Sequence, residues 1–186
     1  MKMLKKMAAV ALAAVMALMM LTACGGGNST ELDFDKDVVG NQAKQAEVLQ
    51  ALNTVRENGG HKAVVENAEA TAIAKKYATL IVWENAGIIS ESEYLARWQQ
   101  VRQLGINGQK PTGFAAINRM MTQRDFEYWS GRDTTENDKV YAALADSYAA
   151  LADSYAALAD SDEVTIAGVS VVELNGEIAT VVLAYK

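Results

Sequence analysis

The sequence contains a single histidine, His61, which is the first residue to consider for acid–base or metal chemistry. Imidazole titrates near neutral pH and can serve as a general base or as a metal ligand. Glu66 and Glu69 follow closely and could complete such a site. Zinc sites draw three or four N, S or O ligands, however, and one histidine with scattered carboxylates is a poor match. We therefore expect no metal and no cofactor, and a structural position for His61 after Gly59-Gly60.

Other catalytic arrangements have less support. A Ser–His–Asp triad could use only His61, and the sequence lacks the Gly-x-Ser-x-Gly motif that presents a nucleophile. Glycine-rich phosphate-binding loops are absent as well. Glu84, Glu91 and Glu93 could act as paired carboxylates. Glu93 lies three residues after Ser90, which predicts a helix capping box instead. We therefore expect a protein that is not an enzyme.

Aromatic residues are better candidates for a binding site. The segment FEYWSGRD, residues 126–133, places Phe126, Tyr128 and Trp129 shortly before a turn, with Arg124 and Arg132 on either side. Aromatic rings beside guanidinium groups can line a groove for a sugar or a peptide. The alternative is that these rings pack beneath a loop.

The N-terminus has the pattern of an export signal. Lys2, Lys5 and Lys6 precede an apolar run from Met7 to Leu21. The run has about 15 residues, fewer than the roughly 20 that a membrane-spanning helix needs, so we expect it to be cleaved. The run ends in LTAC, residues 21–24, which resembles the lipobox of bacterial lipoproteins.

The lipobox resemblance implies that residues 1–23 form a signal peptide and that Cys24 becomes an acylated N-terminus, carrying fatty acids such as palmitate. Two or more acyl chains anchor a protein stably, because each buried CH₂ contributes about 0.8 kcal/mol. The lipid bilayer is then a partner through Cys24, and the protein is extracytoplasmic, lipid-anchored to the bacterial cell membrane. Residues 24–40, rich in glycine and then acidic, are expected to form a flexible tether.

The chain that follows the signal peptide is acidic. Without residues 1–23 it keeps 14 basic and all 23 acidic residues, a net charge of −9. Binding to phosphates needs clustered Lys and Arg, so this balance disfavours nucleic acid as a partner.

Residues 41–186 have the size of one domain. Apolar spacing and stop signals predict helices over about 41–58, 67–83, 90–104 and 112–122. Residues 164–185 are rich in Val and Ile and contain Asn175-Gly176, a strong signal for a two-residue hairpin turn. Both faces of these strands are apolar and need cover. The predicted fold is α+β, with helices packed on both faces of a small antiparallel sheet.

The heptad YAALADS occurs three times in succession over residues 141–161. Its Tyr and Leu residues form one helical stripe: Tyr141, Leu144, Tyr148, Leu151, Tyr155 and Leu158. We favour packing of this stripe on the core, because the flanking positions are Ala and Ser rather than complementary charges. The alternatives are self-association into a homo-oligomer, binding of a partner helix, and a ligand site.

Three segments resemble the CAP (SCP-like) superfamily of cysteine-rich secretory and pathogenesis-related proteins. They are AEVLQALNTVRENGG at 46–60, AIAKKYATL at 72–80 and IAGVSVVELNGEIATVVLAY at 166–185. The resemblance implies an α-β-α sandwich with a cavity that, in some members, holds a divalent metal on two His and two acidic residues. Tyr77 and Phe114 stand at a histidine and an acidic position, and the second histidine falls near Tyr155. These replacements imply a cleft without a metal.

These observations predict a lipid-anchored cell-surface lipoprotein whose non-catalytic CAP-like domain binds an unidentified ligand or partner protein at the cell envelope. The candidate cleft residues are Tyr77, Tyr155, Phe114, Phe126, Tyr128 and Trp129. One alternative is a hydrolase of envelope polymers that uses His61 and a nearby Glu. Another is a structural lipoprotein that self-associates through the Tyr/Leu stripe.

Overall fold

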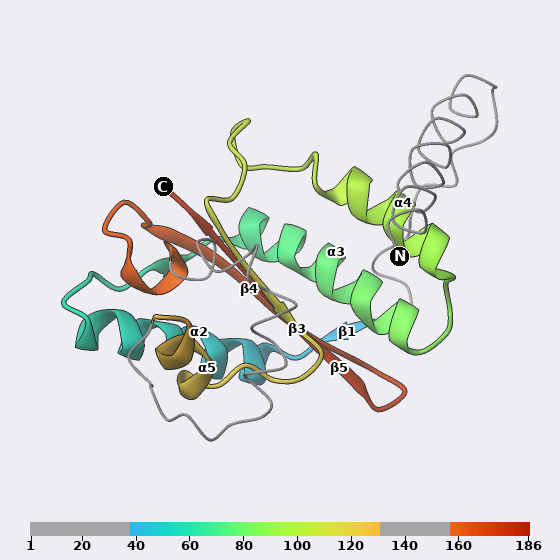
Figure 1. The fold of residues 1–186 in the computed structure, drawn as a ribbon, viewed down its shortest axis with the longest axis horizontal. Coiled ribbons are helices and arrows are strands. Elements are labelled where there is room, and N and C mark those ends of the chain that lie inside the picture. Colours follow the sequence, from blue (N-terminus) through green and yellow to red (C-terminus); the bar gives the residue numbers. More distant parts are fainter. Residues whose placement is uncertain (1–37, 131–156) are drawn as a thin grey trace, which may run out of the picture. The chain divides into compact units, whose positions relative to one another are not determined.

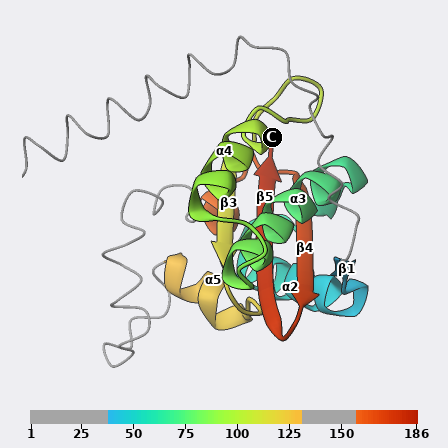
Figure 2. The same cartoon turned by 90° about the vertical axis from the view of Figure 1, so that its right-hand side faces the viewer.

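The structure, a computed structural model, describes residues 38–130 and 157–186. These segments form an α+β domain in which helices cover both faces of one sheet (Figures 1 and 2). The fold class expected from the sequence is therefore confirmed. The strand order is β1 (Val39–Gly40), β4 (Ile166–Leu174), β5 (Glu177–Tyr185) and β3 (Gly113–Ile117). A further strand, β2 (Val65–Glu66), also pairs with β4.

Four helices have their bounds within the described residues. They are α2 (Gln42–Asn58), α3 (Ala68–Asn85), α4 (Glu91–Val101) and α5 (Gln123–Trp129). Polar side chains cap the first three: Asn41, Asn67 and Ser90 each accept a hydrogen bond from a backbone N–H of the first turn. The predicted capping box is present, because the Glu93 carboxylate accepts from the Ser90 backbone N–H at 3.0 Å.

The centre of the sheet is the C-terminal hairpin of β4 (Ile166–Leu174) and β5 (Glu177–Tyr185). Asn175 and Gly176 form its two-residue turn with φ angles of 52° and 87°, as the sequence predicts. β3 (Gly113–Ile117) pairs antiparallel with β5 on one side. On the other side, β1 (Val39–Gly40) pairs antiparallel with β4, whereas β2 (Val65–Glu66) pairs with it in parallel. The sheet is thus antiparallel except at β2.

Two expectations about segment boundaries were wrong. The helix predicted over residues 112–122 is instead β3 followed by an irregular segment, and α5 begins only at Gln123. GFAAI alternates buried and half-buried residues along β5, so strand pairing prevails over the helical propensity of its alanines. The folded part also begins before Asn41. Val38 is 4% exposed and β1 pairs with β4, which places the end of the predicted tether inside the domain.

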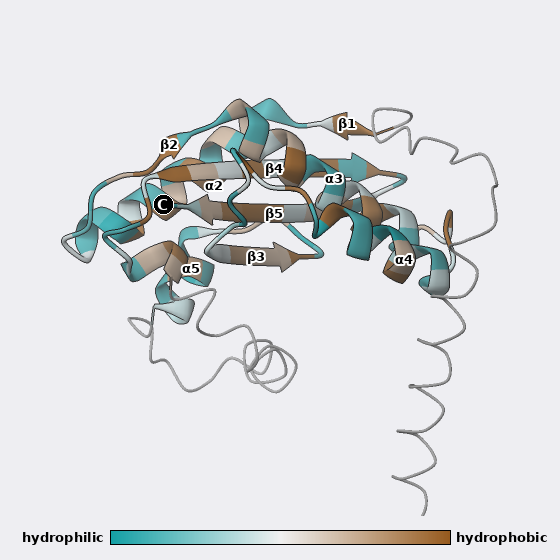
Figure 3. Cartoon of the chain, turned by 90° about the horizontal axis from the view of Figure 1, so that it is seen from above, coloured by the Kyte–Doolittle hydropathy of each residue, from teal (hydrophilic) through white to brown (hydrophobic). Residues whose placement is uncertain are grey.

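The two faces of the sheet have different covers. On one, here called the α2 face, Val48, Leu52 and Val55 of α2 pack with Val169, Val182 and neighbouring residues of the sheet into an apolar core. On the other, the α3 face, α3 runs along β4 and β5, and α4 packs on α3 (Figure 1). Figure 3 shows the sheet from above, with β5 between β3 and β4. This arrangement leaves β3 as an edge strand beside α4.

Candidate functional site

A cleft of about 720 Å³ opens between α4 and β3 on the α3 face of the sheet. We call it the aromatic cleft, and its lining consists of Tyr77, Trp98, Gln99, Arg102, Gln103, Lys110, Pro111 and Phe114. Its volume lies within the range of about 300–1,000 Å³ that is typical of small-molecule sites. The lining comes from α3, α4, β3 and the loop between α4 and β3, so the cleft exists only in the folded domain.

Three rings form the floor of the aromatic cleft. The Tyr77 ring centroid lies 4.6 Å from that of Trp98 and 5.2 Å from that of Phe114, both in edge-to-face contact. The Trp98 and Phe114 centroids are 5.8 Å apart at an interplanar angle of 79°. Such arrangements are the favoured geometry of aromatic pairs. Tyr77 is buried, whereas Trp98 and Phe114 are half-buried and therefore leave ring surface for a ligand.

The elements explain why these rings meet. Tyr77 is one of several residues by which α3 contacts the sheet, with Ala70, Ile73 and Ala74. Phe114 pairs with Leu183 of β5, and strand alternation turns its side chain toward the α3 face. Trp98 lies one helical turn after Tyr94, whose ring centroid is 5.3 Å away. Trp98 is half-buried and lines the cleft.

The polar part of the cleft is cationic. Its lining includes Arg102 and Lys110 and no Asp or Glu. The Lys110 ammonium donates hydrogen bonds to the carbonyl oxygens of Arg102, at 2.9 Å, and Leu104, at 3.4 Å, at the C-terminal end of α4. Within the described residues, neither cation forms an ion pair with a carboxylate.

Tyr77 lines the cleft, and Tyr185 lies close enough to Tyr77 to interact with it electrostatically. Burial raises the pKa of Tyr77, and the positive charge of Arg102 opposes the shift. Burial, together with the charges of Tyr77 and Glu69, raises the pKa of Tyr185 to about 12. Both phenols are therefore neutral at physiological pH. The lining of the cleft contains no His, Asp, Glu or Cys.

The sequence analysis did not identify Arg102 and Lys110 as site residues. The Asn107-Gly108 pair, which marks a turn between α4 and Lys110, could have indicated Lys110. Asn107 and Gly108 have φ angles of 49° and 79° and lie between the bridged residues Ile106 and Gln109. This is a second Asn-Gly turn, like the one at residues 175–176. It reverses the chain directly after α4 and brings Lys110 back to the end of that helix.

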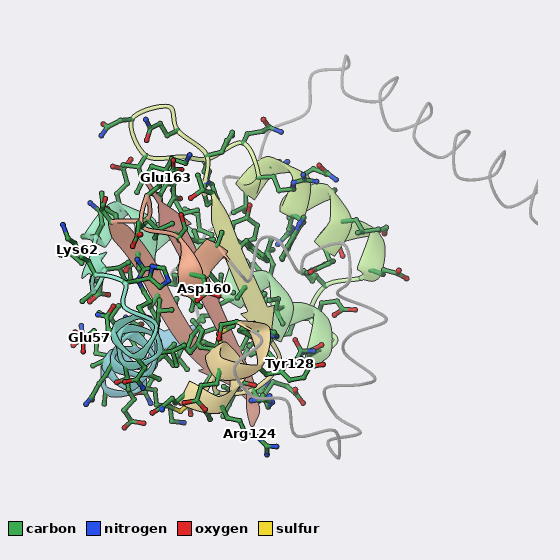
Figure 4. All side chains as sticks on the ribbon, turned by 60° about the vertical axis from the view of Figure 1, so that its left-hand side comes forward. Glu57, Lys62, Arg124, Tyr128, Asp160 and Glu163 are labelled. Atoms are coloured by element: carbon green, nitrogen blue, oxygen red, sulfur yellow. The ribbon has the colours of Figure 1, made fainter. Side chains whose placement is uncertain are left out.

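The other predicted aromatic residues lie elsewhere. α5 packs against α2, and Phe126 is fully buried in the core of the α2 face. The Trp129 ring lies against Phe126, with centroids 5.7 Å apart. Figure 4 shows Tyr128 on the same helix as Arg124. Of the six residues expected to share one cleft, Tyr155 lies outside the described residues. Tyr77 and Phe114 meet, whereas Phe126, Tyr128 and Trp129 belong to α5, which packs against α2.

Most of the repeat lies outside the described residues, including Tyr141, Leu144, Tyr148, Leu151 and Tyr155. Cys24 also lies outside them. Of the Tyr/Leu stripe only Leu158 is described, and it is fully buried against the α2 face. Its position agrees with core packing at the end of the repeat.

His61 contacts two aspartates, Asp160 and Asp162. Its Nδ1 is 2.8 Å from an oxygen of Asp162, and its Nε2 is 3.8 Å from an oxygen of Asp160. The hydrogen bond to His61 lowers the pKa of Asp162. Glu66 instead accepts a hydrogen bond from the Thr71 hydroxyl. A hydrolase site built from His61 and Glu66 or Glu69 has no support in this geometry.

Within residues 38–130 and 157–186 there is no group of three His, Cys, Asp or Glu side chains that could hold a metal ion. None of the helices in these segments has the length and apolarity required to span a membrane. No family model, no curated protein and no solved structure matches the chain.

Proposed function

We propose that this chain is an extracytoplasmic lipoprotein, anchored through acylated Cys24, whose CAP-like domain binds a ligand at the cell envelope without catalysing a reaction. The observation that carries the proposal is the meeting of Tyr77 and Phe114 in the aromatic cleft. A preformed cleft with fixed rings and a few polar groups is typical of a binding site. The lining contains no His, Asp, Glu or Cys, and this composition favours binding.

The CAP resemblance supports the same proposal. It implies helices on both faces of a sheet, and it places Tyr77 and Phe114 at positions where some members hold a metal. Here these two side chains are in ring-to-ring contact at 5.2 Å between centroids. In a CAP-like domain, aromatic residues at these positions would convert a metal cavity into an apolar binding surface.

The proposed binding function predicts that replacing an aromatic residue of the cleft weakens binding, whereas replacing one on α5 does not. Replacing Trp98 with Leu should weaken binding of soluble envelope fractions by about tenfold or more, because the ring supplies much of the exposed apolar surface of the cleft. Titration of the protein purified in mild detergent, monitored by calorimetry, measures this. The matched control is Tyr128→Leu on α5, which should bind as the unaltered protein does. A loss of binding in Tyr128→Leu with none in Trp98→Leu would move the site to the opposite face.

The anchoring part has its own test. Replacing Cys24 with Ser should abolish incorporation of labelled palmitate and release the exported protein from the membrane fraction, because a hydroxyl cannot take the place of the thiol that is acylated. Metabolic labelling followed by fractionation measures both effects. Membrane retention and labelling that persist in Cys24→Ser would rule out anchoring at this residue.

A further inference from the structure

The charge of the aromatic cleft is opposite to that of the protein. The whole chain has 23 acidic and 17 basic residues. The cleft nevertheless combines Arg102 and Lys110 with no acidic lining residue. We propose that the aromatic cleft binds an acidic saccharide, with the sugar carboxylate on Arg102 and Lys110 and a sugar ring on Trp98 and Phe114. This inference rests on the proposed binding function and adds the chemical class of the ligand.

Arg102 is suited to a carboxylate. A guanidinium group presents paired N–H donors that match the two carboxylate oxygens, and such bonds are stronger than those between neutral groups. Within the described residues the Arg102 side chain has no hydrogen-bond or ion-pair partner, so an anion that binds it breaks no bond among residues 38–130 and 157–186. The net negative charge of the protein repels anions. A local pair of cations makes the cleft the place where an anion can bind.

Lys110 is held in place for the same task. Its ammonium group has three N–H donors, of which two are directed to the carbonyl oxygens of Arg102 and Leu104. One donor remains for a ligand. Because the two carbonyl contacts already order this long side chain, binding costs less conformational entropy than it would for a free lysine.

The remaining lining favours a sugar as the bearer of that carboxylate. The flat C–H face of a pyranose can pack on exposed aromatic surface, as other apolar surfaces do, and Trp98 and Phe114 supply such surface. Gln99 and Gln103 lie one helical turn apart, and each amide offers both donors and an acceptor. Hydroxyl groups around a sugar ring match these amides, whereas the side chain of an acidic peptide brings only its carboxylate.

The experiment compares one saccharide in two charge states. The exported full-length protein in mild detergent is titrated calorimetrically with oligogalacturonate and with its methyl ester, which keeps the rings and removes the charge. We expect the acid to bind at least about tenfold more tightly than the ester. In Arg102→Gln and in the double variant Arg102→Gln/Lys110→Gln this preference should fall to less than about threefold. Lys62→Gln, which removes one charge from the exposed loop after α2, should keep it.

Each contrary result has a defined meaning. Equal binding of acid and ester, or a preference that survives in both Arg102 variants, overturns the role of the cations. Failure of both saccharides to bind, or tighter binding of a hexaglutamate peptide, overturns the saccharide class. If the saccharide class is overturned but Trp98→Leu still weakens binding of envelope fractions, the proposed binding function is retained. If Trp98→Leu also has no effect on that binding, the proposed binding function is overturned too.

Discussion

Replacement of Arg56 with Met is expected to lower the free energy of unfolding by about 3–5 kcal/mol. Arg56 is fully buried, and its guanidinium donates four hydrogen bonds to backbone carbonyl oxygens. The acceptors are those of Lys62 at 2.9 Å, Leu158 at 2.6 Å, Ser161 at 3.0 Å and Val164 at 3.1 Å. Methionine fills much of the volume but donates no hydrogen bond, and each buried carbonyl that is left without a donor costs about 1–3 kcal/mol.

The four acceptors show what Arg56 holds together. One belongs to the loop after α2 and three to residues 158–164, which include the end of the repeat, so a single side chain of α2 fixes both. Burial lowers the pKa of Arg56, and the nearby Asp162 and Asp160 oppose this shift.

Denaturant unfolding measures the loss in the free energy of unfolding of Arg56→Met. The control is Lys62→Met in the loop after α2, which is expected to change stability by less than about 0.5 kcal/mol. Unfolding of Arg56→Met within about 1 kcal/mol of the unaltered protein would contradict this account.

Gly168→Ala is expected to be about as damaging, with a loss of about 3 kcal/mol or more. Gly168 is on the α3 face of β4, where α3 crosses at close range. A Cβ at this position would lie 2.2 Å from the backbone carbonyl carbon of Ala70 and 2.4 Å from its oxygen. Backbone atoms cannot rotate away as a flexible side chain can, so α3 as a whole would have to shift.

The neighbouring Ser170 provides the matched control for this prediction. It lies two residues along on the same face of β4, is fully buried, and its hydroxyl has no hydrogen-bond partner among the described residues. Ser170→Ala removes a buried polar group without a partner and should be neutral or stabilising. Thermal or denaturant unfolding separates the two variants. Equal stability of Gly168→Ala and Ser170→Ala would show that α3 does not depend on the close approach at Gly168.

The parts of the fold that the sequence predicted are those with local causes. Asn175-Gly176 forms its turn because both residues accept a positive φ. Ser90 and Glu93 cap α4 through contacts three residues apart. The segments that were wrongly predicted depend on distant partners. β3 exists because Phe114 and its neighbours pair with Leu183 and β5, far along the chain, and GFAAI alone is compatible with a helix.

The candidate site could be predicted only in part for the same reason. Tyr77 and Phe114 followed from the family resemblance, and they do meet. Trp98 has the helical spacing that is typical of a core residue. Its exposure depends on how α4 packs against α3 beside β3. Lys110 reaches the cleft through the turn at Asn107-Gly108, a local signal that becomes meaningful only once the position of α4 is known.

The most direct test of the central claim is a nuclear magnetic resonance titration that follows the indole N–H signals of Trp83, Trp98 and Trp129. The three residues lie in α3, α4 and α5, so each signal reports on a different part of the domain. The account predicts that oligogalacturonate shifts the Trp98 signal saturably and leaves the Trp129 signal in place. A saturable shift of Trp129 with Trp98 unchanged, or no shift of any indole at millimolar ligand, would contradict it.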